Sequence, residues 1–191
     1  SGLIKIGNER VVEARLNDAE FFWNKDKSHN LVKKVSKLKF MNFFKGLGNY
    51  FDKVQRMRKL GSMISDELLI SKEKIELSAS ISKTDLTSEL VGEFPELQGV
   101  MGGYFSAYQG FDKEISLALT EQYLPVGLNS KVPKKPFSIS LSVIDKIDTL
   151  VGFFGIDEKP TSSKDPLALR RTALGIITVS YTHLRAHETI A

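Results

Sequence analysis

The chain contains no cysteine among its 191 residues, so disulfide bonds and thiolate metal ligands are excluded. No apolar run approaches the ~20 residues that a membrane-spanning helix requires. No signal peptide opens the chain either. We therefore expect a soluble protein of the reducing cytoplasm that has no membrane partner.

Histidine is also scarce: the chain has three, namely His29, His183 and His187. Few histidines are therefore available for a Ser-His-Asp catalytic triad. The phosphate-binding sequences GxxxxGK[ST] and GxGxxG are absent. His183 and His187 stand one helical turn apart beside Glu188, a spacing that superficially suggests a metal pair. They belong to the stretch Thr178–Ala191, which breaks the preceding apolar period and which we set aside below.

Apolar and charged residues are both plentiful. Hydrophobic residues make up 41% of the chain, which is ample for a packed core. Lysine and arginine total 27 against 23 acidic residues, so the formal net charge is +4. This mild excess permits a polyanionic partner without requiring one.

Apolar residues recur three or four positions apart through most of the chain, which predicts an all-α fold. The strongest such stripe runs from Leu47 to Ile64, and the outer face of this helix is expected to carry Lys53, Arg56, Arg58 and Lys59. These cations either face solvent or face phosphate groups. Residues 1–10 read differently: Leu3–Ile6 followed by Gly7 predicts a strand entering a turn. The next helix is then expected to start at Asn17 or Asp18.

The stretch Lys83–Gly99 joins two predicted helices through Pro95, which suits the first turn of the second helix. Asp85 and Glu89 are one turn apart on the first of these helices and are expected to project together. In the second, Gly102 and Gly103 predict a close helix–helix approach or a bend.

A second pair of carboxylates, Asp145 and Asp148, shares one face of a later helix. Together with Asp85 and Glu89, these side chains could hold Mg²⁺ or Mn²⁺. They could equally pair with lysine and arginine, and we favour ion pairing because no histidine supports a metal site.

The last predicted helix starts near Asp165, which reads as its N-cap, with Pro166 as the first helical residue. Free amides at this helix start, in the loop Thr161–Asp165, suit an anion, with Lys164 beside them. Arg170 and Arg171 serve either as phosphate forks or as partners of the carboxylates, and we favour the structural role for one of the two.

Several blocks resemble, in order, the beta subunit of the tetrameric bacterial glycyl-tRNA synthetase: Gly7–Trp23, Leu47–Leu60, Lys83–Tyr104, Glu121–Pro125, Asp145–Phe154 and Lys159–Ile177. The resemblance implies an HD-like helical domain of about seven to nine helices over residues 11–177, cut from a much longer beta chain. Residues 1–10 would be the end of a preceding domain or a linker. Residues 178–191 depart from the family and resemble a translated cloning-vector peptide, so we treat them as a non-native tail.

The resemblance also implies a role. In this family the alpha subunit activates glycine with ATP and Mg²⁺, and the beta subunit mainly grips tRNA(Gly) within an α₂β₂ assembly. We therefore expect this segment to hold no cofactor and no catalytic residue, and to contribute phosphate contacts for tRNA(Gly). The expected contacts are Lys53, Arg56, Arg58, Lys59, Lys164, Arg170 and Arg171.

Two alternatives stay open. The domain could be a scaffold that braces its neighbours and touches no RNA. It could also be a metal-dependent HD phosphohydrolase, which needs a lone histidine, a His-Asp doublet and a later aspartate. Here Lys83 and Asp85 occupy the doublet region and Asp145 or Asp148 the later position, with no histidine. These four positions therefore read as a degenerate HD site without a metal.

Overall fold

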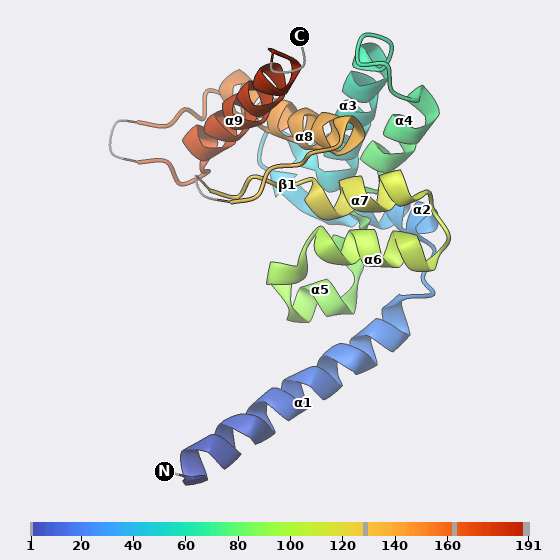
Figure 1. Ribbon diagram of the computed structural model, residues 1–191, viewed down its shortest axis with the longest axis vertical. Helices are drawn as coiled ribbons and strands as arrows, with labels where there is room; N and C mark the ends of the chain where they lie inside the picture. Colours follow the sequence, from blue (N-terminus) through green and yellow to red (C-terminus); the bar gives the residue numbers. More distant parts are fainter. Residues whose placement is uncertain (1, 128–129, 162–163, 189–191) are drawn as a thin grey trace.

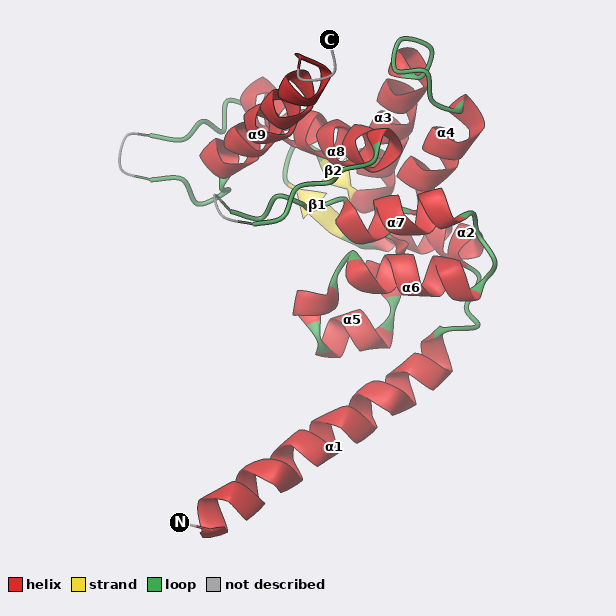
Figure 2. Ribbon diagram, viewed as in Figure 1, coloured by secondary structure: helices red, strands yellow, loops and turns green. Residues whose placement is uncertain are grey.

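The structure is a computed structural model that describes residues 2–127, 130–161 and 164–188, except for the side chains of Leu3 and of residues 182–188. The histidines at 183 and 187 therefore lie outside the described side chains. The described part contains nine α-helices, three short 3₁₀ helices and one two-stranded hairpin (Figures 1 and 2). The predicted all-α fold is confirmed. No helix in this part is long and apolar enough to cross a membrane.

Helix α1 spans Gly2–Asp26 and projects from the rest of the molecule over its N-terminal half (Figure 1). The predicted strand at Leu3–Ile6 and the predicted helix start at Asn17 or Asp18 are both wrong. The segment is rich in good helix formers such as Glu, Ala, Arg and Leu, so the helix continues through Gly7. Only the last turns of α1 pack on the other helices, where Trp23 stacks on Phe105 with ring centroids 5.5 Å apart.

A compact connection follows α1. Its elements are α2 (Leu31–Lys34), the 3₁₀ helix η1 (Val35–Phe40), the antiparallel strands β1 (Asn42–Phe44) and β2 (Gly48–Asn49), and α3 (Tyr50–Ile64). Asn49 Oδ1 accepts from Asp52 N, and Asp52 Oδ2 accepts from Asn49 N, both at 3.0 Å. This reciprocal cap starts α3 at Tyr50.

The helix predicted before Pro95, which was to carry both Asp85 and Glu89, breaks into α4 (Lys72–Ile81), η2 (Thr84–Thr87) and α5 (Glu89–Glu93). Hydroxyl groups at the break bond to nearby carbonyls and compete with the helix: Thr84 Oγ1 donates to Ile81 O at 2.7 Å. The prediction that Asp85 and Glu89 project together is therefore wrong. Asp85 is fully buried, whereas Glu89 lies on the surface, 2.6 Å from Lys25 Nζ.

The chain continues through η3 (Pro95–Leu97), α6 (Val100–Tyr108) and α7 (Lys113–Glu121). Pro95 opens a 3₁₀ turn, and Gly99, with φ +81°, precedes α6. The predicted close approach at Gly103 is confirmed. A Cβ atom on Gly103 would lie 2.7 Å from Ser116 O of α7 and closer still to Thr120 Oγ1.

The last two helices are α8 (Pro136–Gly155) and α9 (Leu169–Glu188). Helix α9 begins at Leu169, so Pro166 is not its first residue as predicted. Pro166 lies in a turn, and Ala168 takes a left-handed φ of 53°. Asp165 nevertheless caps the helix: its carboxylate accepts from Leu169 N at 2.8 Å and from Arg170 N at 3.0 Å.

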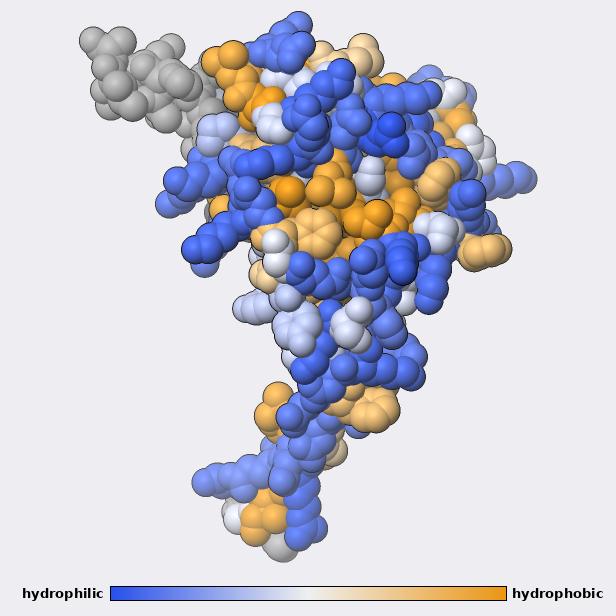
Figure 3. Space-filling model, turned by 90° about the vertical axis from the view of Figure 1, so that its right-hand side faces the viewer, coloured by the Kyte–Doolittle hydropathy of each residue, from blue (hydrophilic) through white to orange (hydrophobic). Residues whose placement is uncertain are grey.

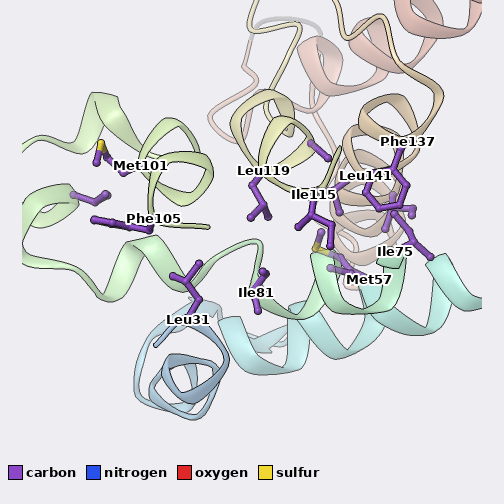
Figure 4. Packing of buried hydrophobic residues seen from close by; sticks show 14 of the residues in the cluster. Leu31, Met57, Ile75, Ile81, Met101, Phe105, Ile115, Leu119, Phe137 and Leu141 are labelled. Atoms are coloured by element: carbon purple, nitrogen blue, oxygen red, sulfur yellow. The ribbon is translucent and has the colours of Figure 1, made fainter. Parts of the chain in front are cut away.

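One apolar core joins these helices. Five of them contribute to one cluster the side chains Met57, Ile75, Phe105, Leu119 and Leu141, each with 0% of its surface exposed, and Figure 4 shows how these residues are spread through it. Burial of each such side chain contributes about 1.5–3 kcal/mol. In this packing α8 contacts both α3 and α9, so polar side chains on these three helices are brought together.

Candidate functional site

Ionisable side chains are buried where α3, α8 and the turn after α4 meet. Lys53 comes from α3, Lys83 from the turn, and Asp145 and Asp148 from α8. Only 3% of Lys53 and 1% of Lys83 is exposed. We call these four residues the ion-pair cluster. The favoured interpretation of Asp145 and Asp148, ion pairing rather than metal binding, agrees with these contacts.

Asp145 lies between the two lysines. Its Oδ1 is 3.0 Å from Lys53 Nζ, and its Oδ2 is 3.1 Å from Lys83 Nζ. Burial by itself would raise the pKa of Asp145, but the two ammonium groups outweigh it and hold that pKa well below its ordinary value. Asp145 is therefore an anion at neutral pH and balances part of the buried positive charge.

The prediction that Lys53 lies on the outer face of its helix is wrong. Its Nζ donates to Asp148 Oδ2 at 3.0 Å and to Thr149 Oγ1 at 2.9 Å. Because α3 packs along α8, Lys53 points into the interface between the two helices and contacts the carboxylates of α8. A buried and fully paired ammonium group cannot contact a phosphate at the surface.

Arg56 closes the outer edge of the ion-pair cluster. Its Nε and Nη2 donate to the two carboxylate oxygens of Asp148 at 2.7 and 3.2 Å, and its Nη1 donates to Leu47 O at 3.0 Å. Such a fork holds both groups in one geometry. Arg58 and Lys59 are exposed as predicted, and Arg58 lies 3.4 Å from a carboxylate oxygen of Glu76.

Lys83 is held from a second side by residues that the sequence did not single out. Its Nζ donates to Gln122 Oε1 at 2.8 Å and lies 4.1 Å from the ring centroid of Tyr123. Gln122 Nε2 in turn donates to Ser82 O at 2.8 Å. No pattern in the sequence marks Gln122, because it follows the end of an amphipathic helix like any surface glutamine.

Of the four degenerate HD positions, the structure brings Lys83, Asp145 and Asp148 together but not Asp85. Asp85 accepts from the backbone N–H groups of Leu86 and Gly99, and burial raises its pKa. Among the residues that the structure describes, no group of three or more His, Cys, Asp or Glu side chains could hold a metal ion.

Lys146 is a further buried cation that sequence reasoning missed. Its Nζ donates to Leu124 O at 2.7 Å and to Ser142 Oγ at 2.8 Å, and no carboxylate of the described residues lies within ion-pair distance. Burial lowers the pKa of Lys146 to about 8. The one signal in the sequence is that Lys146 is a lone lysine in the middle of a strongly apolar helix.

A cavity of about 310 Å³ opens beside the ion-pair cluster. We call it the cationic cavity, because its charged lining consists of Lys53, Lys83, Asp145, Lys146 and Arg171. Among the described residues, four cations thus face it against one carboxylate. Helix α9 supplies Arg171 to this lining, and α3 supplies Lys53.

The two arginines of α9 do not pair with the carboxylates. Arg170 donates to the backbone carbonyl of Thr161. This bond has a structural role, but its acceptor is not a carboxylate. Arg171 is exposed and makes no hydrogen bond or ion pair within the part of the chain that the structure describes. The favoured expectation that one of these arginines pairs with Asp85, Glu89, Asp145 or Asp148 is wrong. Lysines and Arg56 pair with the last three of these carboxylates instead, namely Lys25 with Glu89, Lys53 and Lys83 with Asp145, and Lys53 and Arg56 with Asp148.

The predicted anion site at the start of α9 also changes. Asp165 already accepts from the backbone N–H groups of Leu169 and Arg170, so the amides expected to be free are occupied. Lys164 is exposed, and its side chain has no partner among the described residues. Residues 162–163 of this loop lie outside the description.

Comparisons with known proteins define the class. A sequence model of the family described as "Glycyl-tRNA synthetase beta subunit" matches residues 1–188. The chain therefore belongs to a family of aminoacyl-tRNA synthetase subunits. In particular, it is a member of the glycyl-tRNA synthetase beta-subunit family, as its sequence blocks indicated.

Similar relatives carry the name glycine–tRNA ligase beta subunit. The chain is 44% identical to that of Phenylobacterium zucineum over 177 residues, which cover 91% of this chain and 26% of the relative. It is 47% identical to that of Acinetobacter baumannii over 171 residues, which cover 90% of this chain and 25% of the relative. The chain thus spans about a quarter of the length of the relatives that it matches.

Proposed function

We propose that this segment contributes to binding and positioning tRNA(Gly) within an α₂β₂ glycyl-tRNA synthetase. Glycine activation, with ATP and Mg²⁺, takes place on the alpha subunit, and the segment itself holds no cofactor and no catalytic residue. Membership of the family supports the assignment to glycyl-tRNA synthetase. The exposed cations of this chain support a role of the segment in tRNA binding.

One observation carries the proposal: exposed cations without partners remain on or next to the two helices that flank α8. Lys59 on α3, Lys164 in the loop before α9 and Arg171 on α9 make no side-chain hydrogen bond or ion pair with the described residues. Such a group contacts a phosphate without first breaking an internal bond. Arg58 and Arg170 have one exposed contact each, and we include them in the proposed surface. Lys53 and Arg56, which are engaged by Asp148, are left out of it.

The test uses the whole enzyme with Lys164→Ala or Arg171→Ala in its beta subunit. Each variant should bind tRNA(Gly) more weakly. The slope of log affinity against log salt should become shallower by about one for each phosphate that the variant no longer neutralises. Glycyl-adenylate formation should stay unchanged, because neither residue acts on glycine or ATP.

Lys113→Ala is the matched control. Lys113 is also exposed and unpaired within the described residues, but it lies at the start of α7, outside the proposed surface. Its removal should leave both the affinity and the salt slope as in the wild type. If the Lys164 and Arg171 variants behave like this control, the proposed surface is wrong.

A scaffolding role is the second candidate, and α1 is the observation that favours it. Ile4, Val11 and Leu16 are each more than 60% exposed along its projecting half. Apolar surface is visible along this helix in Figure 3. Side chains of this kind suit packing against another protein surface. Val11→Asp in the whole enzyme should then weaken subunit assembly, whereas Arg171→Ala should leave tRNA affinity intact.

A further inference from the structure

The cationic cavity carries more positive charge than its own contacts balance. Lys53 and Lys83 share Asp145, as described above, but the partners of Lys146 among the described residues are two carbonyls and a hydroxyl, with no carboxylate. Arg171 has no partner within the described residues. Two cations, Lys146 and Arg171, therefore face this cavity without a counter-ion from the described part of the chain.

Helix geometry places these two cations near each other. A Cβ atom on Gly175 of α9 would lie 3.0 Å from Lys146 Cε, so Lys146 packs against that point of α9. Arg171 precedes Gly175 by one helical turn and therefore stands on the same face of α9. Because Gly175 has no side chain, Lys146 can approach α9 closely at this point. The guanidinium group of Arg171 extends from the same face of α9, one turn earlier.

Aromatic side chains also line the cationic cavity. Phe43 and Tyr50 lie edge-to-face with ring centroids 5.3 Å apart, and both are only half-buried. Tyr123 lines the cavity as well and lies beside Lys83. Aromatic rings next to lysine and arginine suit a ligand that joins a planar ring to a phosphate. The volume of about 310 Å³ is at the small end of the range for ligand pockets.

We propose that the cationic cavity binds a mononucleotide, with its phosphate between Lys146 and Arg171 and its base against Phe43 and Tyr50. The mononucleotide is either free or the terminal nucleotide of an RNA strand. Lys53 and Lys83 remain paired with Asp145, and they add positive electrostatic potential to the cavity that they line. This site shares Arg171 with the surface proposed for tRNA, whereas Lys164 and Lys59 of that surface do not line the cavity.

The ionisation of Lys146 supports this geometry. Its pKa is lowered to about 8 by burial, with Asp145 opposing and Lys83 adding to that shift. Lys53 on α3 and Arg171 on α9 are the other charges that line the cavity with it. A bound phosphate would supply the missing counter-ion and raise the pKa of Lys146.

The test is calorimetric titration of the 191-residue chain with AMP at low ionic strength. The wild type should bind with a Kd of about 1 mM or below. Arg171→Gln should weaken AMP binding by about tenfold or more, the loss expected for a charge-assisted bond to phosphate. Lys113→Gln, which removes an equally exposed cation outside the cavity, should leave the Kd unchanged.

Two further titrations define the ligand. Ribose 5-phosphate, which lacks the base, should bind more weakly than AMP, and equal affinity would overturn the assignment to a nucleotide. A short single-stranded RNA with a 5′-phosphate then identifies the source. Displacement of AMP supports an RNA end in the site, whereas AMP that stays bound supports a free nucleotide.

Failure of the proposal is unambiguous. Arg171 is exposed and unpaired within the described residues, so Arg171→Gln should keep the fold, and its AMP affinity reports on the cavity. A wild-type chain that does not bind AMP, or an Arg171→Gln chain that binds it as well as the wild type, would overturn the inference. Weaker tRNA binding by Lys164→Ala with normal AMP binding would leave the tRNA surface standing, so the two proposals fail separately.

Discussion

The ammonium group of Lys83 and the carboxylate of Asp145 lie 3.1 Å apart in the interior of the molecule. Lys83 lies in the turn that breaks the central helical segment, and Asp145 stands in the middle of α8. Their contact ties the break to α8 and leaves neither charge to solvent. A buried pair of this kind is costly to desolvate, so its contribution depends on every member keeping its partner.

Asp145→Asn should destabilise the chain by about 3–5 kcal/mol, because Lys53 and Lys83 would stay buried with less negative charge between them. Unfolding in urea at neutral pH measures this change. Asp85→Asn is the control, since burial raises the pKa of Asp85 and its charged form is not favoured in the same way. Asp85→Asn should lower the free energy of unfolding clearly less than Asp145→Asn does. Equal costs would mean that burial of a carboxylate, rather than the ion pairs, explains the effect.

The pH dependence of Asp145 follows from the direction of its shift. Its pKa in the folded chain lies well below its ordinary value. The stability that it contributes is therefore fully present above pH ~4 and is lost as pH falls toward the folded pKa. This decline should be absent from the Asp145→Asn chain when the two unfolding curves are compared between about pH 5 and pH 3.

Because of Lys146, the free energy of unfolding of the chain should increase as the pH becomes alkaline. Its pKa is about 8 in the folded state against 10.5 ordinarily, so between these values the unfolded chain binds more protons. The free energy of unfolding then increases with pH through this window. Relative to Lys146→Met, the wild type should gain roughly 2 kcal/mol between about pH 7.5 and pH 9.5.

The exposed Lys113 supplies the comparison for this effect. Lys113→Met removes a lysine that is not buried, so its difference from the wild type should stay constant across the same pH range. A constant difference for Lys146→Met as well would show that the buried ammonium group titrates like an exposed one.

Most elements of the fold could be predicted from the sequence, because apolar residues at helical spacing face a common core. The stripe through Met57 lies in that core, and the glycine at 103 marks a close helix contact. Helix α1 could not be predicted in this way, since it projects and has almost no buried face to produce a pattern. The break before Asp85 was missed because local hydroxyl–carbonyl bonds, such as that of Thr84, leave the apolar spacing unchanged.

The candidate site was predicted only in part. Asp145 and Asp148 share a face one turn apart, and this spacing correctly placed them together. Their partners were misjudged, because Lys53 looks like a member of a solvated basic face until α3 is packed on α8. One of Arg170 and Arg171 was expected to pair with a carboxylate, but neither does, and Arg171 has no partner among the described residues. Whether a lysine is buried depends on the neighbouring helix, which a single stripe of residues does not reveal.

The contact between α6 and α7 provides the last prediction. Gly103→Ala would place a methyl group 2.7 Å from Ser116 O and even closer to Thr120 Oγ1. The backbone oxygen cannot move away without displacing α7, so the helices must separate. The expected destabilisation is about 1–3 kcal/mol, even after the better helix propensity of alanine is included.

Gly92→Ala is the control for this contact. Gly92 also lies in a helix, α5, but nothing in the described part of the chain would stand within 4 Å of its new Cβ atom. Alanine there should leave the stability unchanged or raise it by up to about 1 kcal/mol. Thr120→Ser should not rescue Gly103→Ala, because it keeps both a hydroxyl at position 120 and Ser116 O. A Gly103→Ala chain that unfolds at the same urea concentration as Gly92→Ala would show that α6 and α7 are not held at this distance by the missing side chain.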